Sequence, residues 1–333
     1  METRSNNHAA LEADLARWIA SGGTPVTFEE MILRVHRFQR NACGEYAAFC
    51  AGKPDVSEWR EIPAVPVDAF RRAAIRSFAP EQTVRTFLTS GTTGEGRGEH
   101  HFCSLRLYLH AALRGWVSAG LPPGGVVALV PSASEAPTSS LSQMASWLAS
   151  AGDFFFGRWD ALRARVDTGK PVVLFGTALA FLSWFDHLGS DRVALAPGSL
   201  AVETGGYKGS QRTMSKQELY DLFQERLGLG PESVWNEYGM TELSSQFYTR
   251  GLGGVHRAPF WARALVVDPV SGREVAEGET GALRIFDAAN LGSVCAIQTR
   301  DLAIRRGGDF ELIGRDPAAL PRGCSRGAEE TLA

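Results

Sequence analysis

Residues 89–102 read TSGTTGEGRGEHHF and combine glycines, hydroxyl side chains and one arginine directly after the apolar residues 87–88. Closely spaced glycines let the backbone approach an anion, and serine and threonine hydroxyls add hydrogen-bond donors. Two structures fit this composition. One is a surface turn, for which glycine, serine and threonine are ordinary residues, and the other is a loop that binds phosphate. The choice between them depends on the rest of the sequence.

The Walker A loop, GxxxxGK[ST], fits this stretch only in part. Gly91 and Gly96 have the required spacing, but Arg97 and Gly98 follow them. The lysine that reaches the outer phosphates and the hydroxyl that holds magnesium are therefore both missing. The pattern argues against a Walker site.

Composition places the chain among ordinary globular proteins. It has 333 residues, of which 44% are hydrophobic and 21% charged, and a formal net charge of -3. This length suggests one large domain or two small ones, and the near-neutral charge gives no basic footprint for nucleic acid. No window has about 18 apolar residues and no signal-peptide core is present, so we expect no membrane span and a cytoplasmic protein. Five scattered cysteines without a CxxC pair favour reduced thiols.

Periodicity predicts a helical beginning and then an α/β region. Apolar residues three and four apart predict helices over residues 8–20 and 27–50, with Thr27 at the start of the second. After Phe87, short Val, Leu and Ala runs alternate with helical segments, which predicts a largely parallel sheet covered on both faces. Beyond Leu252, strand and turn patterns predict an antiparallel or barrel-like part.

Two later stretches bear on the loop. Residues 236–242, NEYGMTE, can be interpreted locally as a strand-to-helix turn in which Thr241 caps a helix. In residues 299–315, TRDLAIRRGGDFELIGR, Asp301 and Arg315 could each be a surface residue in a turn. Neither local interpretation explains why all three stretches occur in one chain.

Together the three stretches resemble the motifs of the adenylate-forming superfamily, which includes acyl- and aryl-CoA ligases, peptide-synthetase adenylation domains and firefly-type luciferases. The loop resembles [ST]SG[ST]TGxPKG and residues 236–242 resemble YGxTE. Asp301 and Arg315 stand at about the separation of the family's ribose-binding aspartate and hinge arginine. The order and spacing are those of the family.

Four further stretches are similar to the acyl-protein synthetase family of the bacterial luminescence operon. They are PTSSLSQM (137–144), ETGGYKG (203–209), NLGSVCAIQTRDLA (290–303) and GRDPAALPRGCS (314–325). The resemblance implies an α/β fold in which residues 1–315 form a large adenylate-forming domain, with mixed, largely parallel sheets layered with helices and a small β-barrel-like part. Residues 1–85 would be its helical N-terminal part. A short tail, residues 316–333, would stand in place of the usual mobile C-terminal domain.

The same resemblance implies a site for ATP and Mg²⁺. Arg97 stands where the family usually has lysine and would hold the β- and γ-phosphates, while Glu242 matches the magnesium ligand. Tyr238 would stack on adenine, Asp301 would accept hydrogen bonds from the ribose hydroxyls, and Arg315 would donate to the sugar. The remaining nucleotide-binding residues would be Ser90, Gly91, Thr92, Thr93, Gly94, Gly98, Gly205, Gly206, Tyr207, Glu237, Gly239, Met240 and Thr241.

The adjacent residues His100 and His101 raise the alternative of a metal site. Neighbouring residues on a strand point to opposite faces, so the two rings cannot easily share one ion. We expect them to lie on the strand that leaves the loop, where one ring could line an acyl pocket.

The function that this resemblance implies is AMP-forming activation of a fatty or aromatic carboxylic acid, followed by acyl transfer to a thiol. In the luminescence family an acylated cysteine near the C-terminus passes the acyl group to a reductase, and Cys324 could take that role here. An acyl reductase, a carrier protein or coenzyme A would then be the partner. One alternative is a CoA ligase or an adenylate donor to an amine. Another is a degenerate module that only binds nucleotide or acyl chain.

Overall fold

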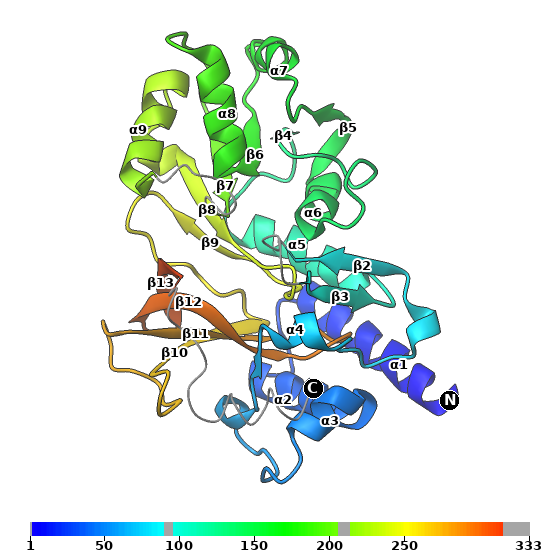
Figure 1. Ribbon diagram of the computed structural model, residues 1–333. Coiled ribbons are helices and arrows are strands. Elements are labelled where there is room, and N and C mark those ends of the chain that lie inside the picture. The colour runs from blue at the N-terminus through cyan, green and yellow to red at the C-terminus, as the bar shows by residue number, and fades with distance from the viewer. Residues whose placement is uncertain (1, 90–95, 206–213, 316–333) are drawn as a thin grey trace. The chain divides into compact units, whose positions relative to one another are not determined.

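The chain forms two compact units in a computed structural model that describes residues 2–89, 96–205 and 214–315 (Figure 1). The first unit consists of Met1–Gly115, Met240–Gln246 and His256–Ala333, and the second of Trp116–Gly239 and Phe247–Val255. The boundary falls inside the NEYGMTE motif, after Gly239. The chain therefore divides this motif between the two units.

The first unit begins with the expected helices, α1 (Glu2–Ala20), α2 (Phe28–Ala42) and α3 (Gly44–Phe49). Thr27 stands at the start of α2, as the sequence predicts, and the structure shows a capping box between Thr27 and Glu30. The single helix expected over residues 27–50 is interrupted, because the backbone at Cys43 is extended. The side of α2 that bears Val35 and Gln39 is buried.

Short elements lead from these helices to the loop. In chain order they are the 3-10 helix η1 (Trp59–Glu61), β1 (Val65–Pro66), α4 (Ala69–Arg72), the 3-10 helix η2 (Pro80–Gln82), β2 (Arg85–Leu88), β3 (Glu99–Phe102) and α5 (Arg106–Ser118). Strands β2 and β3 pair antiparallel, with Leu88 opposite Glu99. The loop of residues 89–98 thus connects the two strands of a hairpin.

A sheet whose strands pair antiparallel, except for β1 with β12, completes the first unit. Its strands are β10 (Ala262–Val267), β11 (Thr280–Asp287), β12 (Ala296–Arg306) and β13 (Asp309–Arg315). The pairing order is β1-β12-β11-β10, with β13 also on β12. Within the described residues, strand pairing leaves this sheet open, so the expected barrel-like part is an open sheet.

The second unit contains the predicted parallel sheet, in the order β5-β4-β6-β7-β8-β9. Its strands are β4 (Val126–Ala128), β5 (Ala149–Phe154), β6 (Val173–Thr177), β7 (Leu200–Thr204), β8 (Val234–Tyr238) and β9 (Phe247–Arg250). All pairs are parallel except β8 with β9. The intervening helices are α6 (Ser140–Leu148), α7 (Trp159–Val166), α8 (Ala178–Leu188), α9 (Lys216–Leu227) and the 3-10 helix η3 (Pro231–Ser233). The alternation expected from the sequence is confirmed.

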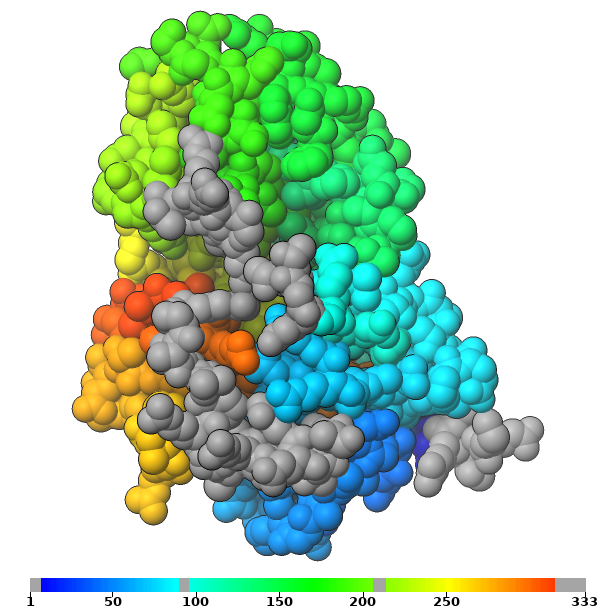
Figure 2. All heavy atoms as spheres, in the orientation of Figure 1, coloured from blue at the N-terminus to red at the C-terminus, as the bar shows by residue number. Residues whose placement is uncertain are grey.

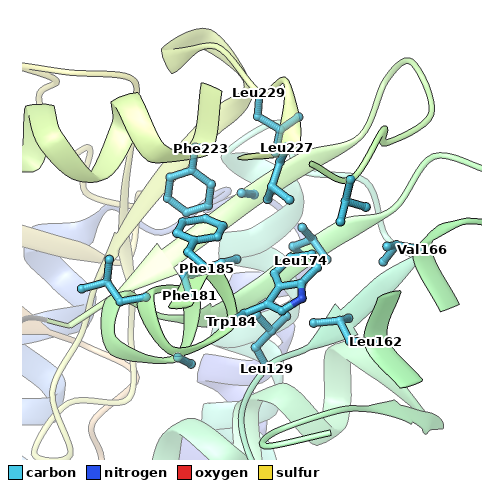
Figure 3. Packing of buried hydrophobic residues seen from close by; sticks show 14 of the residues in the cluster. Leu129, Leu162, Val166, Leu174, Phe181, Trp184, Phe185, Phe223, Leu227 and Leu229 are labelled. Carbon is cyan, nitrogen blue, oxygen red and sulfur yellow. The ribbon is translucent and has the colours of Figure 1, made fainter. Parts of the chain in front are cut away.

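The core of the second unit lies between its sheet and the inner sides of α8 and α9 (Figure 3). Phe181 of α8 packs against Phe223 of α9 with ring centroids 4.8 Å apart, and Trp184 is fully buried. Each such aromatic side chain contributes roughly 1.5–3 kcal/mol by leaving water. The aromatic run FLSWF is therefore core, and the outer sides of α8 and α9 form part of the surface (Figure 2). Phe175 follows the core residue Leu174 in β6, and consecutive strand residues point to opposite faces of the sheet. Trp116, which contacts Phe175, therefore lies on the face opposite this core.

The fold class predicted from the sequence, α/β with mixed, largely parallel sheets and helical layers, is confirmed. No helix in the described ranges 2–89, 96–205 and 214–315 is long and apolar enough to cross a membrane.

Candidate nucleotide site

Three residues bring the two ends of the predicted phosphate loop together. They are Thr89, Arg97 and Gly98, which we call the loop stem. The backbone N–H of Thr89 donates to the carbonyl oxygen of Gly98 at 2.9 Å, and the N–H of Gly98 donates to Thr89 Oγ1 at 2.9 Å. The predicted phosphate-binding residues Ser90, Gly91, Thr92, Thr93 and Gly94 lie outside the described residues. The stem therefore extends the β2–β3 hairpin by one pair and fixes where the loop begins and ends.

Arg97 projects from the stem with an exposed side chain. Its Nε donates to the carbonyl oxygen of Thr89 at 2.9 Å. The terminal nitrogens of the guanidinium group take no part in this bond, and these are the atoms that form a bidentate pair with phosphate oxygens. The stem thus orients the arginine through Nε.

Gly98 is required by close packing. A Cβ at this position would lie 3.2 Å from the carbonyl oxygen of Phe70, 3.1 Å from Cγ2 of Thr89 and 3.3 Å from Cγ of Arg71. In contrast, a Cβ at Gly96 would meet nothing within 4 Å. Of these two glycines, only Gly98 therefore allows α4 to pack directly on the loop stem.

Residues Met240–Gln246, which we call the turn segment, carry the second half of the NEYGMTE motif in the first unit. The helix considered at Thr241 is not formed; residues 241–242 form a turn and the chain continues into strand β9. Side chains from distant parts of the chain hold this turn. The carbonyl oxygen of Thr241 is 2.7 Å from Nδ1 of His100, and Nδ2 of Asn290 donates to the carbonyl oxygen of Glu242 at 2.9 Å.

A buried aspartate anchors the other end of the turn segment. Asp287 accepts hydrogen bonds from the backbone N–H of Ser244 at 2.9 Å and from Ser245 Oγ at 2.7 Å. Ser245 Oγ in turn accepts from Nε1 of Trp261 at 2.9 Å. Burial raises the pKa of Asp287 to about 6, against the opposing effect of these donors.

Sequence reasoning missed the roles of Asp287 and Asn290. Asn290 begins the stretch 290–303 that carried part of the resemblance, but its contact with the turn segment was not foreseen. One available signal was that Asp287 and Asn290 are polar residues within the largely apolar stretch RIFDAANLGSVCAI. Polar residues in such surroundings are usually buried together with a hydrogen-bond partner.

Glu242, the predicted magnesium ligand, is buried, with 8% of its surface exposed. Among the described residues, no group of three His, Cys, Asp or Glu side chains could hold a metal ion. Magnesium in nucleotide sites is commonly held by one or two carboxylates, with phosphate oxygens and water as the other ligands. The single carboxylate of Glu242 therefore fits a metal ion that binds together with ATP, rather than one held permanently by protein side chains.

Asp301 and Arg315, predicted to bind the ribose, are brought together by the β12–β13 hairpin. They stand directly opposite each other in the antiparallel register, although 14 positions apart in sequence. Asp301 is buried, and its backbone N–H donates to Oγ1 of Thr299 at 3.1 Å. The neighbouring Arg300 forms a 2.6 Å ion pair with Asp68, which precedes α4. The side chain of Arg315 lies outside the described residues.

The second unit holds the predicted adenine residues. Thr204, the last residue of β7, stands opposite Glu237 of β8, so Gly205 and Tyr238 follow at the carboxyl ends of two neighbouring parallel strands. Open α/β sheets bind ligands at that edge. Gly205 has φ 69°, a left-handed conformation that favours glycine. Gly206 and Tyr207 lie outside the described residues.

Two carboxyl groups lie buried near this edge. Glu237 accepts a hydrogen bond from Oγ1 of Thr204, while Glu203 accepts one from Nδ2 of Asn236 at 2.7 Å. Burial raises the pKa of each carboxyl group to about 7. The side chain of Glu237, a predicted nucleotide-binding residue, is thus hydrogen-bonded to the neighbouring strand.

Tyr238 and the residues after it complete the motif. Its side chain is 7% exposed, and its ring lies edge-on to Phe247 at a centroid distance of 6.1 Å. Gly239 is exposed at the end of the second unit's segment, while Met240 and Thr241 are half-buried in the first unit. The motif thus supplies Tyr238 to the second unit and Glu242 to the first.

The two adjacent histidines lie on β3 and point to different partners. His100 is bonded through both ring nitrogens, to the Thr241 carbonyl oxygen and to Ser293 Oγ, while His101 lies 3.0 Å from Oγ1 of Thr86. The two rings thus have separate hydrogen-bond partners, in line with their opposite directions on the strand. The expectation that one of the two rings lines an acyl pocket stays a prediction, and both nitrogens of the His100 ring have partners inside the first unit.

Comparison with known proteins extends these observations. No family model matches the chain. A curated relative, the long-chain-fatty-acid--luciferin-component ligase of Vibrio harveyi, is 26% identical over 135 residues, which are 37% of this chain and 35% of that protein. The chain therefore matches about a third of the relative's length.

Solved structures share the fold. A 2-hydroxyisobutyryl-CoA ligase in complex with 2-HIB-AMP and CoA has a TM-score of 0.63 at 16% identity, over 86% of this chain and 73% of that one. ATP-bound MatB from Rhodopseudomonas palustris has a TM-score of 0.51 at 16% identity, over 72% of this chain and 49% of that one. McyG A-PCP, complexed with phenylalanyl-adenylate, has a TM-score of 0.51 at 15% identity, over 72% and 48%. The chain therefore has the fold of the adenylate-forming superfamily, as its motifs predict.

Proposed function

We propose that this protein activates a carboxylic acid with ATP, forming an acyl-adenylate and releasing pyrophosphate. The observation that carries the proposal is the arrangement inside the first unit. A loop stem with an exposed arginine is joined through His100 to a turn whose buried carboxylate is Glu242. This combination provides a cation for the leaving phosphates and a carboxylate for the metal ion of MgATP.

The chemistry requires one anion to attack another. An oxygen of the substrate carboxylate forms a bond to the α-phosphorus, and the bond from that phosphorus to the bridging oxygen of pyrophosphate breaks. Magnesium bound to ATP would neutralise charge on the phosphate oxygens. Arg97 would hold the departing β- and γ-phosphates, so that charge building on the leaving group meets a fixed cation. Glu242 would hold the metal ion.

The remaining predicted residues would hold the nucleoside. Asp301 would accept hydrogen bonds from the ribose hydroxyls, with Arg315 opposite it, and Gly205, Gly206, Tyr207 and Tyr238 would contact the adenine. The loop residues Ser90, Gly91, Thr92, Thr93 and Gly94 would donate to the phosphates. Residues 1–315 would act as the adenylate-forming domain, followed by a tail of residues 316–333.

For the second step we propose transfer of the acyl group to a thiol, either that of Cys324 or that of a partner. The thiolate would attack the acyl carbon, a thioester bond would form, and AMP would leave with the electron pair of the broken bond. Cys324 lies outside the described residues. Its support is the sequence resemblance, together with a curated relative named as a long-chain-fatty-acid ligase. A fatty acid is therefore the first acid to test, with an acyl reductase or carrier protein as partner in the cytoplasm.

A second candidate function is a ligase that joins the acid to coenzyme A. Its support is the similarity to the 2-hydroxyisobutyryl-CoA ligase, whose structure contains both an acyl-adenylate and CoA. Product mass spectrometry with and without coenzyme A separates the two: acyl-CoA indicates the ligase, and acylated protein indicates self-transfer.

The first step can be tested by exchange of radiolabelled pyrophosphate into ATP with a panel of fatty and aromatic acids. Acid-dependent exchange is the expected result. Absence of exchange with every acid, in protein that remains folded, would rule out adenylation. For Cys324, retention of full acyl labelling in Cys324→Ser would exclude this residue as the acceptor.

A further inference from the structure

One buried histidine joins the strand that leaves the loop stem to the turn segment. His100 is the second residue of β3, two positions after Gly98, and its side chain is fully buried. Nδ1 lies 2.7 Å from the carbonyl oxygen of Thr241, and Nε2 lies 3.0 Å from Oγ of Ser293. Both ring nitrogens therefore have partners within the first unit.

These partners determine which nitrogen carries the hydrogen. A carbonyl oxygen can only accept, so Nδ1 donates to Thr241, and the neutral ring then accepts the Ser293 hydroxyl at Nε2. Burial lowers the pKa of His100 to about 4, which keeps the ring neutral near pH 7. The rings of Phe70 and Phe102, with centroids 5.6 Å and 4.3 Å away, limit its orientation.

The bond to Thr241 acts on Glu242 through the backbone. The carbonyl group of Thr241 belongs to the peptide plane before Cα of Glu242, and the carbonyl group of Glu242 belongs to the plane after it. His100 holds the first and Asn290 holds the second. With both planes held, φ and ψ of Glu242 are fixed, and so is the direction in which its side chain leaves the backbone.

We propose that His100 is a positioning residue for the carboxylate of Glu242, which it keeps in register with β3, the strand that directly follows Arg97 and Gly98. The inference rests on the proposed function, in which Arg97 holds phosphate and Glu242 holds the metal ion of MgATP. The loop stem has its own bonds, through Thr89. Loss of the histidine bond would therefore move the metal-binding carboxylate relative to the phosphate-binding arginine.

The test compares three variants with the wild type. His100→Leu removes the donor, and His100→Asn keeps an N–H donor near the position of Nδ1. His101→Leu is the matched control, because His101 is also buried on β3 but faces Oγ1 of Thr86 on β2. Each protein is assayed for pyrophosphate exchange against Mg²⁺ concentration, for affinity for Mn²⁺ATP by water-proton relaxation, and for its thermal unfolding midpoint.

We expect His100→Leu to raise the Mg²⁺ requirement or lower kcat by about 10- to 100-fold in total, the range for residues that orient metal ligands. Its KM for the carboxylic acid should not change. His100→Asn should recover most of the loss, and His101→Leu should leave the Mg²⁺ dependence unchanged even if its unfolding midpoint falls as far as that of His100→Leu.

Two outcomes would overturn the positioning role alone. In the first, the wild type is active and His100→Leu has the same Mg²⁺ dependence as His101→Leu. In the second, His100→Asn is folded but does not recover the activity lost in His100→Leu. If the wild type binds Mn²⁺ATP but does not exchange pyrophosphate, the Mn²⁺ATP affinities of the variants test the positioning role. A His100→Leu affinity no lower than that of His101→Leu would overturn it. A wild type with neither exchange nor Mn²⁺ATP binding overturns the proposed function and this inference together.

Discussion

The predicted nucleotide residues of the two units are held in place by different means. In the first unit, the turn segment is irregular, and side chains from β3 and from residues 287–290 bind its backbone. In the second unit, Gly205 and Tyr238 follow paired parallel strands, whose register alone makes them neighbours. The position of the irregular turn segment thus depends on hydrogen bonds from buried polar side chains. The positions of Gly205 and Tyr238 at the sheet edge depend on the pairing of backbone strands.

The largest loss of activity should come from replacing Arg97, a residue of the first unit that we expect to affect catalysis but not stability. Arg97→Ala removes the exposed cation at the loop stem and should lower kcat/KM for ATP by on the order of 100-fold or more, since it removes electrostatic stabilisation of the leaving group. The thermal midpoint should change little. Arg97→Lys keeps the charge but loses the fork, so its exchange rate should lie between those of Arg97→Ala and the wild type; equal losses in both variants would contradict the phosphate role.

Asp287→Ala tests whether the turn segment depends on buried side chains. It leaves the N–H of Ser244 and the hydroxyl of Ser245 without their acceptor in the core, which should cost about 2–4 kcal/mol of unfolding free energy. Urea denaturation gives that free energy. Asp287→Asn retains an acceptor oxygen and should cost less. If Asp287→Ala unfolds at the wild-type urea concentration, the network does not hold the turn.

Gly98→Ala tests the close approach of α4 to the loop stem. The added Cβ would lie 3.2 Å from the Phe70 carbonyl oxygen, so the stem must shift by a few tenths of an ångström. We expect exchange to fall by roughly 10-fold, as misplacement of catalytic groups by such amounts commonly does. Gly96→Ala, where space is open, should stay near the wild-type rate. Similar rates in both variants would show that the stem tolerates the shift.

The buried carboxyl groups of the second unit predict a pH effect. Burial raises the pKa values of Glu203 and Glu237 to about 7, so the native state holds protons that the unfolded state releases near pH 4.5. The contribution of these two carboxyl groups to stability is therefore fully present below pH 4.5 and is lost as the pH rises through 7. Glu203→Gln or Glu237→Gln should raise unfolding free energy by about 1 kcal/mol or more at pH 8 and flatten the dependence between pH 5 and 8. If the slope of unfolding free energy against pH is unchanged in both variants, the two carboxyl groups do not have raised pKa values in the native state.

Most of the regular structure could be predicted from local pattern. The alternation of apolar runs and amphipathic segments predicted β4 to α9, because strands covered on both faces are apolar throughout while helices repeat every 3.6 residues. Thr27, followed by two glutamates, predicted where α2 begins. The break at Cys43 was missed, since the apolar spacing continues across it, and the turn at Thr241 was misread because a threonine before a glutamate also fits a helix start.

The sequence by itself determined the motifs, their order and the spacing of Asp301 and Arg315 along the chain. The register that places these two residues opposite each other includes a β-bulge between Leu302 and Ala303, which the spacing alone does not reveal. Only the tertiary structure decided that His100, Asp287 and Asn290 hold the turn segment. Their partners lie between 42 and 141 positions away along the chain. Hydrogen bonds over such separations leave no periodic trace in the sequence, since they depend on which buried donors and acceptors the folded backbone brings within about 3 Å of one another.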